Sequence, residues 1–137
     1  MKPINEVYAD ERYSWYKYQP MLDSFGYTIL VQEDEDNYSG DSWLLMQDGS
    51  RYGYLQFGWG SCSGCDALQM CENLTEVAEL RDELHGKIQW FPDAQAALQF
   101  MTTHDWQGDY SYGTEEAERF VQRAIEYLNA QVNAGAE

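Results

Sequence analysis

Two cysteines separated by two residues are the part of this sequence whose type and spacing point most directly to chemistry. Cys62 and Cys65 stand in the run GWGSCSGCDAL, in which three glycines alternate with tryptophan, serine and cysteine. The residues before this run alternate as in a β-strand, and Asp66 onward is typical of the start of a helix. A strand, a glycine-rich loop with a Cys-x-x-Cys motif and a helix is an order in which proteins place reactive thiols.

Thiol redox chemistry is the first interpretation of this pair. A thiol at a helix N-terminus faces the positive end of the helix dipole, and the resulting lower pKa favours attack on disulfides. The order is that of a thioredoxin-type motif, and Trp59 precedes it. Two features argue against thiol redox chemistry. An antiparallel meander rather than a βαβ unit leads into the motif, and Pro92 opens a helix instead of preceding a strand.

A zinc site is the second interpretation. Cys62 and Cys65 have the spacing of a zinc knuckle, and Cys71, His85 or His104 could complete four ligands. Structural zinc sites usually contain two such pairs, however, and at ~100° per residue Cys65 and Cys71 lie about 120° apart around a common helix. The third interpretation is that the cysteines are small hydrophobes packed in a tight loop.

The sequence contains no arrangement typical of a hydrolase. Ser61 and Ser63 lie in the glycine-rich loop, but without the spacing of a nucleophile elbow or the lysine of a phosphate-binding loop. Nothing in the sequence places His85 or His104 beside either serine. We therefore expect a protein that binds rather than catalyses.

Acidic residues are the second feature with functional content. The chain has 24 Asp and Glu against 8 Lys and Arg, a net charge of −16. Such a charge excludes nucleic-acid binding through phosphate neutralisation, disfavours anionic membrane surfaces and attracts basic proteins. Two clusters are predicted to bind a basic partner: Glu33, Asp34, Glu35 and Asp36 in a turn, and Glu72, Glu76, Glu79 and Glu83 along one helix face. The alternative is a solvated acidic face that only keeps the protein dissolved.

The elements that position these residues begin with three strands. Residues 27–33, 41–47 and 51–57 are rich in β-branched and aromatic residues or alternate in polarity. Asp48 and Gly49 are typical of a tight hairpin between the second and third strands. The pattern predicts an antiparallel β-meander over residues 26–58.

Helical spacing of apolar residues follows the cysteine loop. A short helix is predicted over residues 66–72, and Asn73 is a predicted N-cap for the next helix, with Glu76 three residues on. Residues 87–91 can form a short strand, Pro92 and Asp93 open a third helix, and Thr114 caps the last one. The interval 104–113 is expected to be a loop or a brief strand.

These elements predict one α+β domain over residues 1–137, a three-stranded antiparallel β-meander followed by three to four helices packed on it. It divides into an aromatic N-terminal arm (1–20), the meander (26–58) and a helical part (65–131). The arm has Tyr13, Trp15, Tyr16 and Tyr18 within six positions. We expect it to lie on the domain, the alternative being a free aromatic contact surface.

The cysteine count and the first residues indicate a reducing compartment. Three cysteines are an odd number, and residues 1–8 lack the apolar core of a signal peptide. No run approaches the ~18 apolar residues that a membrane span needs. A cytoplasmic protein without a structural disulfide framework is the expectation.

The run YGYLQFGWGSCSGCDAL at 52–68, with ELRDEL at 79–84, resembles small, mostly uncharacterised bacteriophage-encoded acidic proteins with a GSCSGCDAL-type motif. The resemblance implies expression in a bacterial cytosol during infection. Small acidic proteins in that setting often inhibit host defence nucleases or host transcription, some of them as DNA mimics. It therefore implies an inhibitor of a basic, nucleic-acid-binding host protein, for which we expect no cofactor. The alternative is a protein that binds zinc or performs thiol redox chemistry through Cys62 and Cys65.

Overall fold

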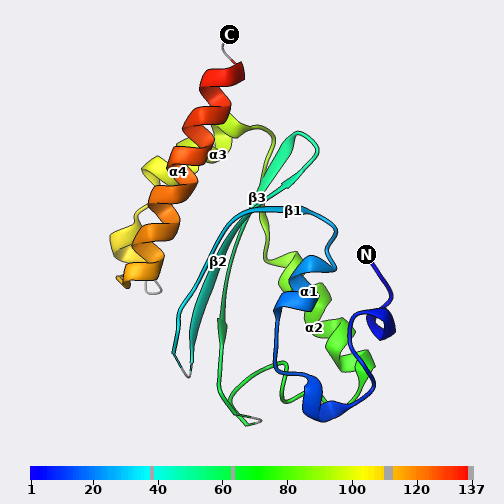
Figure 1. Ribbon diagram of the computed structural model, residues 1–137. Helices are drawn as coiled ribbons and strands as arrows, with labels where there is room; N and C mark the ends of the chain where they lie inside the picture. The colour runs from blue at the N-terminus through cyan, green and yellow to red at the C-terminus, as the bar shows by residue number, and fades with distance from the viewer. Residues whose placement is uncertain (38, 63, 110–112, 136–137) are drawn as a thin grey trace.

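An antiparallel sheet forms the centre of the fold. The computed structural model describes residues 1–37, 39–62, 64–109 and 113–135. Strands β1 (Thr28–Asp34), β2 (Gly40–Asp48) and β3 (Arg51–Trp59) form the predicted meander, which is confirmed. The short strand β4 (Gln89–Phe91) pairs with β3, so that the described part of the sheet has the order β1-β2-β3-β4 (Figure 1).

The turn between β2 and β3 shows why the hairpin forms where the sequence predicts it. Asp48 pairs with Arg51, which leaves Gly49 and Ser50 as the two central residues. Gly49 has φ of 62°, a left-handed conformation that glycine adopts without steric cost. Glycine at the first central position is typical of the tight turns that match strand twist.

The sheet is buried on both faces, and successive residues of β2 and β3 alternate between two cores. Tyr52 and Tyr54 of β3 point into one core, and Leu55 and Phe57 into the other, as the alternation predicts. On β2, Trp43 points into the same core as Tyr52 and Tyr54, and only 1% of its surface is exposed. A central strand covered on both faces explains the near-continuous apolar run of β2.

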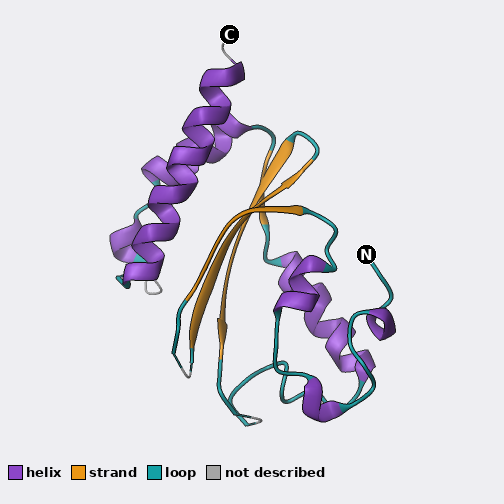
Figure 2. Cartoon of the chain, viewed as in Figure 1, coloured by secondary structure: helices purple, strands orange, loops and turns teal. Residues whose placement is uncertain are grey.

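Two helical layers cover the two faces (Figure 2). Helices α3 (Ala94–Thr103) and α4 (Glu115–Gly135) pack on one face, where Phe120 and Met101 are buried. Helices α1 (Gln19–Asp23) and α2 (Leu74–Gly86), with the short 3-10 turns η1 (Ile4–Glu6) and η2 (Arg12–Ser14), lie on the other. The helices therefore flank the sheet on both sides, an arrangement that the sequence pattern did not specify.

Local capping signals fix where the long helices begin. The Asn73 side chain accepts a hydrogen bond from the backbone N–H of Glu76 (2.9 Å), and Asp93 accepts one from Ala96 (2.8 Å). Thr114 does the same for α4, accepting from the N–H of Ala117 at 3.2 Å. All three predicted helix starts are confirmed, because each cap satisfies a backbone donor of the first turn.

The helix predicted over residues 66–72 is wrong. The described residues of this segment form turns, including a hydrogen bond from Met70 N–H to the Asp66 carbonyl (2.9 Å). The Asp66 side chain accepts from the backbone N–H of Gln69 (3.1 Å), as an N-cap does, but the turn that it caps ends at Met70. The interval 104–113 contains the short turn η3 (Trp106–Gly108), and residues 110–112 lie outside the described residues.

The N-terminal arm lies on the α2 side of the sheet and combines buried and exposed aromatics. Tyr8 and Trp15 are core residues, and the Trp15 indole N–H donates to the Ala9 carbonyl at 2.7 Å. Tyr13 and Tyr16, by contrast, are 97% and 56% exposed. The arm is thus laid on the domain, as expected, and also presents two tyrosine rings to solvent.

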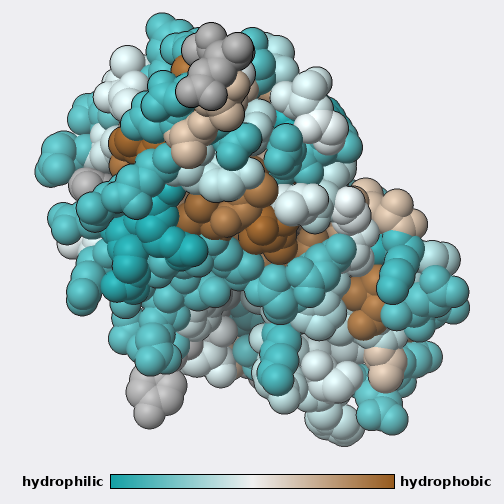
Figure 3. Space-filling view, turned by 45° about the horizontal axis from the view of Figure 1, so that its top comes forward, coloured by the Kyte–Doolittle hydropathy of each residue, from teal (hydrophilic) through white to brown (hydrophobic). Residues whose placement is uncertain are grey.

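Hydrophilic residues cover most of the face seen in Figure 3, with apolar residues gathered near its centre and in a smaller patch to the right. Among the described residues, no helix is both long enough and apolar enough to cross a membrane. The longest described helix, α4, instead has an apolar stripe of Ala117, Phe120, Val121, Ala124 and Leu128 packed on the sheet.

Buried tyrosines make the fold sensitive to alkali. Burial raises the pKa of Tyr8 to about 12, and it also raises the pKa of Tyr18 and of Tyr54. A pKa that is higher in the folded state gives stability that is complete below the ordinary value of about 10 and is lost as the pH rises through the folded value. We expect cooperative unfolding between about pH 10 and pH 12.

The measurement is tyrosinate absorbance followed together with far-UV circular dichroism. The expected result is a late phase of tyrosine ionisation that coincides with loss of the dichroism signal. Ionisation of all eleven tyrosines near pH 10 with the dichroism unchanged would contradict the burial of these hydroxyls.

Candidate functional site

Helix α2 has one face in the core and an outer face whose charged side chains are all acidic. Val77, Leu80 and Leu84 are buried against the sheet. Arg81, the arginine of this helix, is also turned inward and is only 8% exposed. Its Nη1 donates to the backbone carbonyl of Lys2 at 2.7 Å, so this cation holds the N-terminal segment instead of balancing charge outside.

The outer face of α2 borders a groove that we call the acidic groove. Its volume is about 680 Å³, and it is lined by Ala67, Met70, Glu76, Glu79, Leu80, Asp82 and Glu83. Met70 is 55% exposed, one of the few large apolar side chains at the surface. The groove therefore combines carboxylates with accessible apolar surface.

The carboxylates of the acidic groove take part in none of the ion pairs formed by the described residues. These carboxylates are Glu76, Glu79, Asp82 and Glu83. Glu79 lies three residues from Glu76 and from Asp82 and four from Glu83, so like charges are neighbours on the helix surface. Each such pair destabilises a helix by about 0.2–0.5 kcal/mol.

Glu72 lies next to this face but outside the helix, which corrects the prediction that it stacks with the other glutamates. Asn73 has extended backbone angles (φ −153°, ψ 169°), so the chain changes direction there and α2 begins at Leu74. The Glu72 N–H donates to Oε2 of Glu76 at 3.4 Å. Three of the four predicted helix glutamates, Glu76, Glu79 and Glu83, do share the groove.

The second predicted cluster is not part of this surface. Glu33 accepts from Arg119 Nε (2.8 Å) and also pairs with Arg123, both on α4, so its charge is balanced and it belongs to the opposite face of the sheet. The lining of the acidic groove, as far as the structure describes it, includes none of residues 33–36. We therefore leave Glu33 out of the proposed surface.

Two of the remaining acids of that cluster, Asp34 and Glu35, accept hydrogen bonds at the end of the β1–β2 hairpin. Asp34 accepts from the Gln32 side-chain amide (3.1 Å), and Glu35 Oε1 accepts from the Asp41 N–H (3.1 Å). Burial raises the pKa of the Glu35 carboxyl, although the Asp41 N–H opposes that effect. Asp36 is exposed. Residues 33–36 thus lie together in sequence without forming one free acidic surface.

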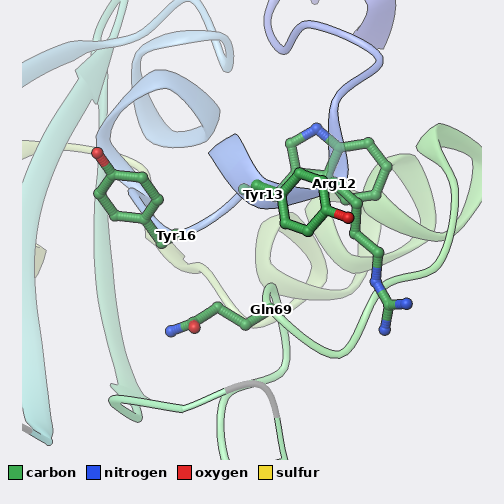
Figure 4. A pocket seen from close by; sticks show the side chains of 5 residues that line it. Arg12, Tyr13, Tyr16 and Gln69 are labelled. Atoms are coloured by element: carbon green, nitrogen blue, oxygen red, sulfur yellow. The ribbon is translucent and has the colours of Figure 1, made fainter.

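An aromatic cavity lies beside the acidic groove. It has a volume of about 520 Å³ and is lined by Arg12, Tyr13, Trp15, Tyr16 and Gln69 (Figure 4). The tyrosines and Arg12 come from the N-terminal arm, whereas Gln69 belongs to the loop between β3 and α2. Met70, the next residue, lines the acidic groove, so one loop contributes to both features.

A buried carboxylate fixes this loop. Asp66 is only 1% exposed, and its Oδ1 accepts from the Tyr18 hydroxyl (2.9 Å) and from the Gly60 N–H (2.9 Å). Its Oδ2 accepts from the Gln69 N–H (3.1 Å), and the Tyr18 hydroxyl in turn accepts from the Leu68 N–H (3.1 Å). The loop is therefore tied to the N-terminal arm through one carboxylate and one phenol.

The cysteines occupy the exposed end of the same loop. Cys62 and Cys65 are joined as a disulfide with their Cα atoms 5.3 Å apart, and both residues are exposed. The sequence predicts no disulfide framework, and this single local bond corrects the expectation of unpaired thiols. Their exposure also contradicts the interpretation of both cysteines as buried hydrophobes.

The ligands expected for the zinc alternative lie elsewhere. Cys71 is buried, and its thiol donates to the Ala67 carbonyl (3.4 Å). His85 Nε2 is 2.7 Å from the Tyr27 hydroxyl, and His104 Nε2 is 3.3 Å from an Asp109 carboxylate oxygen. Across the described ranges, no group of three or more His, Cys, Asp or Glu is arranged to hold a metal ion.

Comparison with protein-family models, curated proteins and solved structures finds no match to this chain. The site therefore has to be interpreted from its own chemistry.

The residues of this region that sequence reasoning missed include Met70, Asp82, Asp66 and Tyr18. Asp82 has a signal, because it follows Glu79 by three residues and so shares its helix face. Asp66 and Tyr18 have none, because they are 48 residues apart and meet only in the folded chain.

Proposed function

We propose that this chain is a non-enzymatic binding protein that docks on a basic, nucleic-acid-binding partner through the acidic groove. The observation that carries the proposal is the distribution of charge on α2. Its outer carboxylates have no ion-pair partner among the described residues, whereas its own arginine, Arg81, is buried. A partner with a lysine- and arginine-rich groove has the complementary potential.

The arrangement favours recognition over a role in solubility alone. Solubility requires only net charge, which can be dispersed, whereas like charges three and four residues apart on one helix reduce its stability. Arg119 and Arg123 are available on α4 but pair with Glu33 on the other face of the sheet. The exposed Met70 beside the carboxylates adds the apolar contact that interface centres contain.

The row of acids suits a partner that normally binds nucleic acid. Glu76, Glu79 and Glu83 follow one another at about 4.5 and 6 Å along the helix axis, a line of negative charge that is sparser than the one phosphate per ~3.4 Å of axis on a single DNA strand but of the same sign. The tyrosines of the aromatic cavity, Tyr13 and Tyr16, extend the surface with exposed rings. The resemblance to bacteriophage proteins supports a host protein in the bacterial cytosol as the partner and inhibition as the outcome.

The first test is the salt dependence of binding. The partner is captured from a lysate at low salt, identified and purified, and its dissociation constant is measured across ionic strengths. We expect affinity to fall by about 10- to 100-fold between ~50 and ~200 mM salt, because exposed charge pairs are screened over a Debye length of about 10 Å.

Competition with DNA distinguishes a nucleic-acid groove from any other basic surface. Saturating the purified partner with its double-stranded DNA is expected to exclude the protein, because both occupy the same cationic groove. Affinity that is independent of salt, or a stable ternary complex with DNA, would contradict the proposed function.

A further inference from the structure

The Cys62–Cys65 pair has properties that the proposed binding function does not use. The disulfide lies at the surface, and exposed disulfides are the ones that proteins use as labile or regulatory bonds. From this pair and its surroundings we propose that Cys62 and Cys65 form a reversible thiol–disulfide exchange site, in which an external dithiol attacks Cys62 and Cys65 is the leaving sulfur.

The two sulfurs have different surroundings, which assigns their roles. Gly60 packs against Cys65 so closely that a Cβ at position 60 would lie 2.6 Å from the Cys65 carbonyl oxygen and 3.1 Å from its Sγ. Because position 60 is a glycine, no side chain covers Cys65 Sγ there, and it is their hydrogen bonding that distinguishes the two sulfurs. The Cys62 N–H lies 2.9 Å from Cys65 Sγ and points its proton at it. A hydrogen bond to the charged form stabilises a departing thiolate.

The exchange is a balanced two-electron reaction. A thiolate of the dithiol attacks Cys62 Sγ, the Cys62–Cys65 bond breaks, and Cys65 leaves as a thiolate that takes a proton from water. The second thiolate of the reagent then attacks the mixed disulfide, which releases Cys62 as a thiolate that is also protonated. The reagent ends as a disulfide, and the protein ends as a dithiol.

The surrounding loop is built to remain folded through this reaction. The Cys62 carbonyl accepts from the backbone N–H groups of Cys65 (3.1 Å) and Asp66 (3.0 Å), so the turn does not depend on the sulfur bond. The buried Asp66 carboxylate continues to hold Gly60 and Gln69. The thiols therefore stay close together after reduction, which favours reclosure.

The test uses Cys71→Ala in every sample, because the buried Cys71 has a thiol that would complicate titration; burial raises its pKa. A small dithiol such as dithiothreitol reduces this protein, thiols are titrated, and an oxidised dithiol is then added. We expect two titratable thiols after reduction and none after reoxidation, with circular dichroism and the urea midpoint showing a folded protein throughout.

Single variants test the assigned roles. Cys65→Ser leaves Cys62 as the thiol, and Cys62→Ser leaves Cys65, so the two are matched in composition. Reaction of each with an aromatic disulfide reagent at neutral pH is expected to be several-fold faster for Cys62→Ser, because the backbone N–H of position 62 stabilises the thiolate of Cys65, the proposed leaving sulfur. Equal or reversed rates, unfolding on reduction, or thiols that do not reoxidise would overturn the proposal.

Discussion

Exchanging Glu79 and Glu83 for lysine is expected to weaken binding of the basic partner by about 100-fold, since like charges placed against each other at an interface cost several kcal/mol. Both side chains are exposed on the outer face of α2 and line the acidic groove. The double change replaces two attractions by two repulsions at the centre of the proposed surface. The measurement is the dissociation constant of the purified partner at low salt.

A matched control separates this local effect from net charge. Glu118 and Glu126 are exposed on α4, which covers the opposite face of the sheet. The Glu118→Lys and Glu126→Lys pair changes the net charge from −16 by the same four units (two reversals, each of two) as the α2 pair does. We expect less than about threefold weaker binding for this control, because charges outside an interface act mainly through screened, long-range steering.

Stability provides the second control. The α2 variant turns the repulsions of position 79 with Glu76 and Asp82 into attractions, whereas the 79–83 pair stays like-charged and position 83 then repels Lys87. Its free energy of unfolding is therefore expected to lie within a few tenths of a kcal/mol of that of the wild type. A loss of binding would then not come from unfolding. Equal weakening by the α2 and α4 pairs would show that net charge, and not the groove, determines binding.

Elements whose signals are local in sequence could be predicted from the residues. The strands follow from alternation, and Gly49 marks the hairpin because the turn requires its positive φ. The starts of α2, α3 and α4 follow from Asn73, Asp93 and Thr114, because each cap acts within three residues of itself.

The errors arise where a side chain has a distant partner. The helix predicted at 66–72 stops after one turn. Asp66 caps that turn through the Gln69 N–H, but the extended backbone of Asn73 redirects the chain, and the other Asp66 oxygen binds the distant Tyr18 hydroxyl and Gly60 N–H. The sequence predicts Glu33 in a free acidic turn, but Glu33 pairs with Arg119, which is 86 residues away. Charge clusters read from sequence therefore need the fold before they can be called surfaces.

In the candidate site, too, the features that depend on local spacing could be predicted, and those that depend on distant contacts could not. Helical spacing alone places Glu76, Glu79 and Glu83 on one face of α2. It does not indicate that Arg81 turns inward to the Lys2 carbonyl and so forms no ion pair with that face in the described part of the chain. Nor does it place Met70 beside the acids, because the β3–α2 loop acquires its shape from the buried Asp66.

Replacing Asp66 with alanine is expected to lower the free energy of unfolding by about 3–5 kcal/mol, since it leaves several buried donors without an acceptor. The donors are the Tyr18 hydroxyl and the N–H groups of Gly60 and Gln69. Asp66→Asn retains one acceptor oxygen and is expected to cost less, about 1–3 kcal/mol. Urea unfolding measures these free energies. The control is Asp82→Ala, which removes an exposed carboxylate and is expected to change the free energy of unfolding by less than about 0.5 kcal/mol.

A double-mutant cycle assigns the loss to the contact between Asp66 and Tyr18. Tyr18→Phe keeps the ring packed against Phe57, with centroids 5.1 Å apart, but removes the donor to Asp66 and the acceptor for the Leu68 N–H. We expect it to cost about 1–2 kcal/mol alone and to couple with Asp66→Asn by at least about 1 kcal/mol, because residues in one hydrogen-bond network are not additive. Additive effects, or an Asp66→Ala protein within about 1 kcal/mol of the wild type, would show that the loop is held without this carboxylate.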